Sequence, residues 1–154
     1  MSAPATGPES GATVQPRPAE GYAGDITPQQ AWTLLELDPG AILVDVRTEG
    51  EWRAVGVPDL GGLGKETVFT QWVTGDGRPN SSFLAELRAA GVDPGRPVVF
   101  LCRSGQRSIG AARLATAAGI APSYNVLEGF EGAPGPDGVR DREGWKVRGL
   151  PWTG

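Results

Sequence analysis

Cys102, the only cysteine of the chain, lies between an apolar run at residues 98–101 and a polar turn that reads Arg-Ser-Gly-Gln-Arg at residues 103–107. Cysteine reacts as its thiolate, which backbone N–H groups of a turn, a following helix and nearby arginines all stabilise. The chain contains no histidine, so activation of the thiol has to come from such groups. The pattern therefore predicts nucleophilic chemistry at Cys102.

A lone cysteine is more often a small buried hydrophobic residue than a catalyst. Buried cysteines lie inside apolar runs, however, whereas four of the five residues after Cys102 carry polar side chains. A strand that ends at the nucleophile, followed by a tight turn and a helix, is also typical of other nucleophile sites. We therefore favour the functional interpretation over simple burial.

Alternating strand and helix patterns surround this turn. Thr27 is expected to cap a helix, with Pro28 in its first position and Gln30 in its third, and a helix is expected to follow Cys102 at once. Further segments are predicted as strands at residues 42–46, 67–73, 97–101 and 123–127, and as helices beginning at residue 80 or 81 and at residue 108. The alternation predicts an α/β fold with a mostly parallel sheet, in which Cys102 lies at the carboxyl end of a strand.

Four motifs in order resemble those of the single-domain rhodanese (thiosulfate sulfurtransferase) family. They are the Cys102 turn with Ser108, Leu-Val-Asp-Val-Arg at 43–47, Glu-Trp at 51–52 and Tyr-Asn-Val-Leu-Glu-Gly-Phe at 124–130, with Trp145 after them. The similarity covers about residues 22–152. One departure is Val-Gly-Val-Pro at 55–58, where the family usually has a histidine.

The resemblance implies a rhodanese-like three-layer α/β sandwich, with helices on both faces of the central sheet. It also implies that Cys102 takes up the outer sulfur of thiosulfate or a persulfide and passes it to cyanide or a thiol. Asp45 is expected to support the site, paired with an arginine such as Arg47 or Arg107, because an acid within an apolar strand is costly unless it is paired. The residues expected to form the loop and contact substrate are Arg103, Ser104, Gly105, Gln106, Arg107 and Ser108. Within this set, Arg103 is the expected contact for a sulfonate group.

Composition narrows the function further. The net charge is −4, yet residues 96–113 contain four arginines and no acid. This distribution predicts a small anionic substrate and argues against a nucleic-acid partner. The resemblance implies that this substrate is a sulfur donor, with a thiol, cyanide or an acceptor protein as the acceptor. No run is long and apolar enough for a membrane span. The expected organisation is a disordered tail at residues 1–20 and one domain at 21–154, in a cytoplasmic protein with neither cofactor nor metal.

Three alternatives remain open at this point. Cysteine phosphatases have a similar loop, but with one residue more between cysteine and arginine than the four present here. A non-catalytic or partner-specific sulfur-carrier module would retain the fold without turnover. A redox thiol would need an external partner, because the chain has no second cysteine. Cysteine–histidine proteases, Cys/His zinc sites and CxxC oxidoreductases are excluded by residue counts alone.

Overall fold

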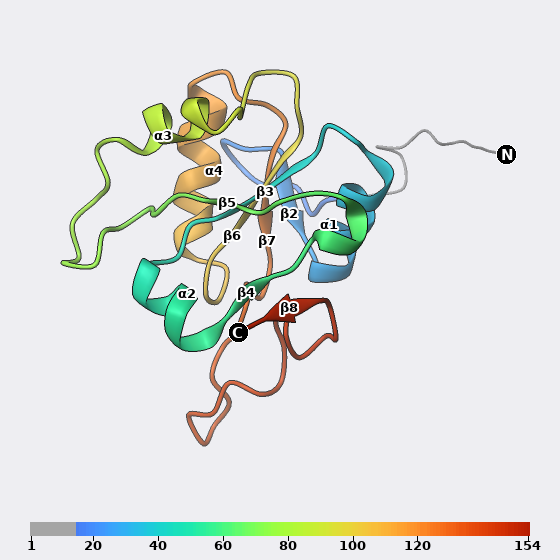
Figure 1. The fold of residues 1–154 in the computed structure, drawn as a ribbon, viewed down its shortest axis with the longest axis vertical. Coiled ribbons are helices and arrows are strands. Elements are labelled where there is room, and N and C mark those ends of the chain that lie inside the picture. The colour runs from blue at the N-terminus through green and yellow to red at the C-terminus, as the bar shows by residue number, and fades with distance from the viewer. Residues whose placement is uncertain (1–14) are drawn as a thin grey trace, which may run out of the picture.

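The computed structural model describes residues 15–154, which are built around a parallel sheet of five strands in the order β2-β7-β6-β3-β5 (Figure 1). All four neighbouring pairs in this sheet run parallel. The strands are β2 (Gly24–Ile26), β3 (Ile42–Asp45), β5 (Val68–Phe69), β6 (Val98–Leu101) and β7 (Ser123–Val126). Parallel strands need crossover connections, and each of the four connections between successive strands of this sheet contains an α-helix.

Four α-helices flank the sheet, together with one 3-10 turn. They are α1 (Pro28–Leu37), α2 (Glu49–Val55), α3 (Phe83–Ala89), α4 (Arg107–Ala117) and the 3-10 turn η2 (Gly61–Leu63). A short antiparallel pair joins β4 (Val57–Pro58) to β8 (Trp152–Thr153), so the C-terminal segment lies beside the segment after α2. None of the helices in the described part of the chain is long and apolar enough to cross a membrane.

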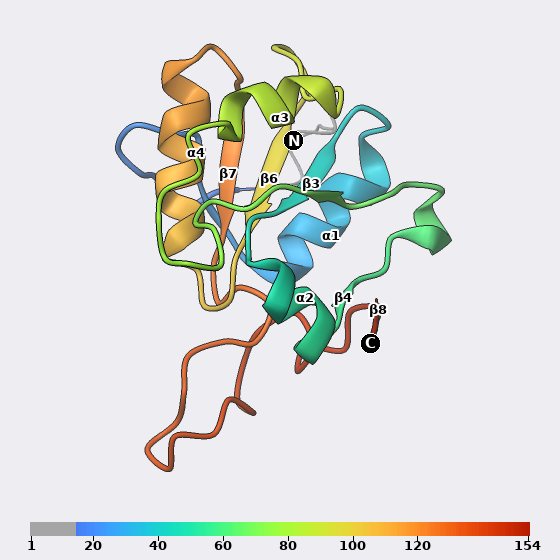
Figure 2. The same ribbon diagram turned by 60° about the vertical axis from the view of Figure 1, so that its left-hand side comes forward.

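Successive residues of the central strands face two separate cores, which makes the molecule three-layered. Val98 and Phe100 point to the core under α3 and α4, whereas Val99 and Leu101 point to the core formed with α1 and the C-terminal segment. Figure 2 shows α1 on one side of the sheet and α3 and α4 on the other. Burial on both faces explains why these strands read as continuous apolar runs. The observed fold confirms the predicted rhodanese-like α/β class.

The structure confirms the helix start that the sequence predicts at Thr27. Thr27 accepts a hydrogen bond from the Gln30 N–H, and the Gln30 side chain accepts one from the Thr27 N–H. The strand predicted at residues 67–73 is shorter, since only β5 is a strand. The N–H groups of Thr70 and Trp72 still donate to the carbonyls of Asp45 and Val46, and Val73 then bridges to Pro79. The next helices begin at Phe83 and Arg107, rather than at residue 80 or 81 and residue 108.

The N-terminal boundary lies partly within the described residues. Residues 1–14 of the predicted tail lie outside the described part of the chain. Arg17 forms an antiparallel bridge with Asp25 through two backbone hydrogen bonds of 2.8 and 2.9 Å, and Ala19 packs against the core. The described end of that segment therefore packs on the domain.

Candidate active site

Cys102 directly follows β6 and is buried, with 1% of its surface exposed. Asp45 ends the neighbouring strand β3 and is paired in register with Leu101, so both strands deliver their last residues to the same edge of the sheet. The loop from Cys102 to α4 lies near α2 in both views (Figures 1 and 2). The carboxyl ends of parallel strands are where ligands bind in such sheets.

The loop after Cys102 curls back so that its own groups face the sulfur. The Gly105 N–H donates a hydrogen bond to Cys102 Sγ at 3.1 Å, and the Ser108 hydroxyl lies 3.1 Å from the same atom. Gly105 has φ = +97°, a conformation that side chains rarely adopt. The N–H groups of Arg103, Ser104 and Gln106 have no hydrogen-bond partner within residues 15–154. The Gly105 N–H can stabilise negative charge on the sulfur, and the unpartnered N–H groups beside it in the loop are further donors for an anion.

A second segment clamps the backbone of the loop. The Phe130 N–H donates to the Cys102 carbonyl at 2.8 Å, and the Glu131 N–H donates to the Arg103 carbonyl at 2.9 Å. Gly129, with φ = +64°, allows this close approach, because a Cβ there would lie 2.5 Å from the Cys102 carbonyl oxygen. The turn after β7 therefore fixes the position of the nucleophile.

Asp45 and Arg47 form a fully buried ion pair beneath this clamp. Arg47 Nε and Nη2 donate to the Asp45 carboxylate at 2.9 and 2.7 Å, and Nη2 also donates to the Gly56 carbonyl at 2.9 Å. The Arg47 guanidinium lies over the Phe130 ring, 4.2 Å from its centroid. Since Phe130 holds the Cys102 carbonyl, the pair supports the loop through this aromatic contact.

The arginine-rich stretch is not a free basic patch. Arg103 pairs with Glu131 at 3.1 Å, and Arg107 forms a two-pronged pair with Glu51 at 2.8 and 2.9 Å. The sequence shows no acid near these arginines, yet the fold brings both carboxylates from other segments. The remaining two arginines of the stretch, Arg96 and Arg113, donate to backbone carbonyls.

The Glu51–Arg107 pair keeps both groups charged. Burial acts to raise the pKa of Glu51, but hydrogen bonds from Arg107 and from the Thr48 N–H outweigh it and lower that pKa to about 2. The hydrogen bond to Glu51 raises the pKa of Arg107, and negative charge on Cys102 acts in the same direction. Arg107 thus supplies positive potential to the sulfur while Glu51 holds it in place.

The remaining loop side chains differ in what they do. The side chains of Ser104 and Gln106 make no hydrogen bond within the described chain, and Gln106 is the N-cap residue of α4. Ser108 is fully buried and contacts Cys102 Sγ and the Asn125 side chain instead of capping the helix.

Sequence reasoning missed Asn125 and Asp25 behind the cysteine. The Asn125 amide donates to the Asp25 carboxylate at 2.9 Å, and both residues are buried. A signal existed, because a polar side chain within a central strand such as β7 is costly unless it is hydrogen-bonded.

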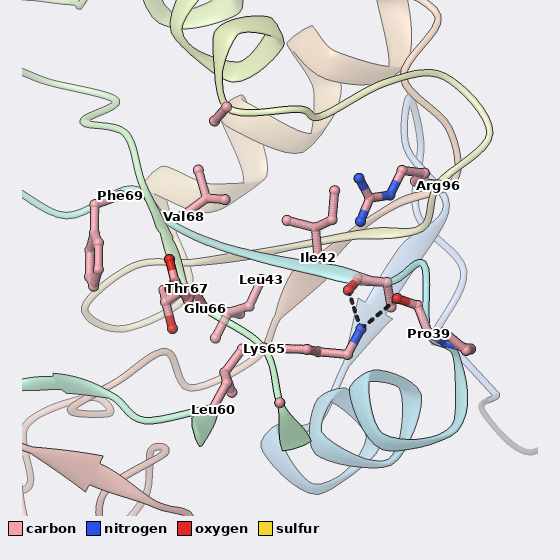
Figure 3. Close-up of a pocket in the computed structure, with 13 residues that line it drawn as sticks. Pro39, Ile42, Leu43, Leu60, Lys65, Glu66, Thr67, Val68, Phe69 and Arg96 are labelled. Carbon is pink, nitrogen blue, oxygen red and sulfur yellow. Dashed lines mark hydrogen bonds between the residues drawn. The ribbon is translucent and has the colours of Figure 1, made fainter. Parts of the chain in front are cut away.

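A pocket of about 530 Å³ lies at the other end of the sheet (Figure 3). Its lining includes Ile42, which begins β3, and none of the residues 102–108. Lys65 Nζ there donates to the backbone carbonyls of Asp38, Pro39 and Ala41 at 2.8–3.1 Å. These three bonds hold Lys65 against the turn that follows α1, so the lysine is not available for chemistry at Cys102.

Within residues 15–154, no group of three or more histidine, cysteine, aspartate or glutamate side chains is placed to hold a metal ion.

The sheet, the loop and the buried cysteine define a rhodanese-like domain of the sulfurtransferase type. The family described as the STR4 middle domain matches residues 23–154, and the chain belongs to this family.

Known proteins agree with that assignment. The crystal structure of Rv0390 from M. tuberculosis has 61% sequence identity and a TM-score of 0.81, covering 86% of this chain and 98% of that one. The chloroplastic protein THYLAKOID RHODANESE-LIKE of Oryza sativa is 33% identical over 84% of this chain, which spans 25% of the rice protein. The polysulfide-sulfur transferase homodimer of Wolinella succinogenes has 26% identity and a TM-score of 0.56, covering 84% of this chain and 77% of that one.

Proposed function

We propose that the protein is a sulfurtransferase that carries sulfane sulfur from thiosulfate or a persulfide to a thiol or cyanide, as a persulfide on Cys102. The observation that carries this proposal is the hydrogen bond from the Gly105 N–H to Cys102 Sγ, in a loop whose neighbouring N–H groups have no partner within residues 15–154. The structural similarity to a polysulfide-sulfur transferase supports the same class of chemistry.

The reaction runs in two displacement steps. In the first, the Cys102 thiolate attacks the outer sulfur of the donor, the donor's S–S bond breaks, and its electron pair leaves with sulfite or with a thiolate. The new persulfide carries its negative charge on the outer sulfur, within reach of the unpartnered N–H groups of the loop. In the second step, cyanide or an acceptor thiolate attacks that outer sulfur, and the Cys102 thiolate leaves.

No general base is needed at the point of attack, because the nucleophile reacts as a thiolate. Arg107 contributes positive potential to the sulfur, and we assign the contact with a sulfonate to Arg103. Arg103 is 46% exposed at its side chain, which leaves it open to a small anion or to an acceptor protein.

The test is the intact mass of the protein before and after incubation with thiosulfate, and separately with a small persulfide. We expect the wild-type chain to gain the mass of one sulfur atom and to lose it when cyanide is added, with thiocyanate released. Cys102→Ala and Cys102→Ser should fold normally and gain nothing.

Sulfur uptake by Cys102→Ala would contradict the mechanism. Absence of uptake by the wild-type chain from both donors would also contradict it, and would favour a module that binds a partner without turnover. Ser81→Ala is the control, because Ser81 is exposed, lies outside the loop and makes no side-chain hydrogen bond in the described chain.

A further inference from the structure

A chain of buried polar side chains extends from Cys102 into the sheet. Ser108 Oγ lies 3.1 Å from Cys102 Sγ and donates to Asn125 Oδ1. Asn125 Nδ2 donates to Asp25 at 2.9 Å, and the Tyr22 hydroxyl donates to the same carboxylate oxygen at 2.7 Å. The chain therefore connects α4, β7 and β2, and all of its members are buried.

The direction of these hydrogen bonds follows from the partners of Asn125, because a carboxylate and a backbone carbonyl can only accept. Asn125 Nδ2 faces the Asp25 carboxylate and the Gly105 carbonyl, the latter at 3.3 Å. Burial, and then the bond to Asp25, raise the pKa of Tyr22 to about 12, so that its hydroxyl stays protonated and donates. Arg17 holds the other Asp25 oxygen at 3.3 Å. Asn125 must therefore turn Oδ1, an acceptor, toward Ser108.

This orientation decides what Ser108 offers to the sulfur. A hydroxyl has one proton, and both Asn125 Oδ1 and Cys102 Sγ lie within acceptor distance of Ser108 Oγ. Asn125 Oδ1 is the closer of the two and has no other donor among the described residues, so we assign the proton to it. Only a lone pair of Ser108 Oγ then faces Cys102 Sγ. A thiol can donate its S–H proton to that lone pair. The inner sulfur of a persulfide has no proton to donate, but it is neutral and is therefore repelled by the lone pair less than a thiolate is. A thiolate would need the Ser108 proton, and taking it would leave the buried Asn125 oxygen without a partner.

We propose that Asp25 and Asn125 are positioning residues that act through Ser108 to disfavour negative charge on Cys102 Sγ, and so favour the loaded persulfide over the free thiolate. Loading moves the charge from Sγ to the outer sulfur, away from Ser108 and toward the N–H groups of the loop. The part that concerns the persulfide rests on the proposed function, whereas the part that concerns the thiolate does not.

Other charged groups near the sulfur belong to different elements and stay in place. Arg107 on α4 acts on the thiolate directly, and its partner Glu51 lies on α2. Asp45 and Arg47 neutralise each other beneath the loop. None of these four side chains hydrogen-bonds to Asn125, so a change at Asn125 tests the chain of hydrogen bonds separately from them.

The test uses Asn125→Leu, which has similar size and no acceptor, alone and combined with Ser108→Ala. Thiolate is measured by its ultraviolet absorbance at near-neutral pH, with Cys102→Ala subtracted. We expect the thiolate-to-thiol ratio to rise about tenfold in Asn125→Leu, because Ser108 becomes free to donate to the sulfur. In the Ser108→Ala background the same change should have no effect.

The second measurement is the fraction of chain loaded with sulfur at equilibrium in a thiosulfate and sulfite mixture, read by intact mass. At a pH where free Cys102 is thiolate, we expect the ratio of loaded to free Cys102 to fall about tenfold in Asn125→Leu. A rise in thiolate with a fall in loading is a signature that general damage to the fold does not produce. Ser123→Ala is the matched control, since Ser123 is buried in the same strand but bonds to Ile120.

An unchanged thiolate ratio in a folded Asn125→Leu chain would overturn the proposal, as would an equal rise in the Ser108→Ala background. Asn125→Ala removes the same acceptor with a smaller side chain and replaces Asn125→Leu if the latter does not fold. If the wild-type chain takes up sulfur from neither donor, the proposed function fails, while the thiolate measurement still decides whether Asn125 controls the charge on Sγ.

Discussion

Arg103 and Glu131 form an ion pair at the mouth of the Cys102 site, with Arg103 Nε 3.1 Å from Glu131 Oε2. Oε2 is buried and accepts no hydrogen bond within the described residues, so the two groups are close but poorly aligned. The Glu131 carboxylate thus offsets the positive charge of Arg103 that a sulfonate would meet, although no well-aligned hydrogen bond joins the two side chains. If the proposed function holds, we expect donor selection at this site to depend on an acid as well as on an arginine.

Glu131→Gln should increase the use of thiosulfate. The substitution removes a negative charge beside the path of a dianionic donor and frees Arg103 to contact it. We expect kcat/KM for thiosulfate to rise about three- to tenfold, as for one charge interaction of ~1 kcal/mol near a surface. An uncharged persulfide should change little. The measurement is steady-state transfer to cyanide with both donors.

Arg103→Ala gives the opposite result under the same interpretation, because thiosulfate loses its contact while the uncharged donor does not. Glu36→Gln is the control, since it makes the same change of charge at an exposed position on α1. Equal changes with both donors in Glu131→Gln or in Arg103→Ala would contradict a role for this pair in donor choice.

From the Glu51–Arg107 pair we predict that the folded chain loses stability in acid. The pKa of Glu51 is about 2 in the folded chain, below the value of about 4.3 in an unfolded chain. A carboxylate with a depressed pKa stabilises the fold above its unfolded pKa, and that contribution is lost as the pH falls toward 2. Because the pair is partly exposed, we expect it to contribute on the order of 1–2 kcal/mol.

Urea unfolding at several pH values checks this. The wild-type chain should lose more stability than Glu51→Gln as the pH falls from about 4.5 to about 2. Parallel curves for the two proteins over that range would show that the pair does not stabilise the fold.

Local chemistry made part of this molecule predictable from sequence. The capping box at Thr27 and Gln30 involves residues three positions apart, and the run at 98–101 reports burial on both faces of the sheet. Both are short-range patterns, which a single sequence displays directly. The fold and the position of Cys102 at a strand end follow from such patterns.

Contacts between distant segments were not predictable in the same way. The bond between Asn125 and Asp25 spans 100 residues, and that between Arg107 and Glu51 spans 56. No spacing rule connects such positions, so the sequence showed an arginine-rich stretch where the fold has neutral pairs. The buried polar residue in β7 indicated a missing partner without identifying it.

Gly129→Ala should displace the loop that carries the nucleophile. The residue has φ = +64°, and a Cβ would lie 2.5 Å from both the Arg103 carbonyl carbon and the Cys102 carbonyl oxygen. We expect destabilisation of about 2–4 kcal/mol and a sharp loss of sulfur transfer. Gly62→Ala is the control, because nothing lies within 4 Å of a Cβ there and its φ is not positive. Thermal unfolding and transfer assays on both variants measure the difference, and similar behaviour would contradict the clamp.

Asp45→Asn should be costly although the substitution keeps the side chain's size. It leaves the Arg47 guanidinium buried beside Phe130 without its counter-charge, which costs about 3–5 kcal/mol in other proteins. Asp76→Asn, at an ion pair whose members are 83% and 62% exposed, should cost less than about 0.5 kcal/mol. Urea unfolding gives both values, and equal costs would contradict a structural role for the buried pair. The double variant Asp45→Leu with Arg47→Leu should lose less stability than the sum of the losses in Asp45→Leu and in Arg47→Leu. In the double variant neither partner is left as an unpaired buried charge.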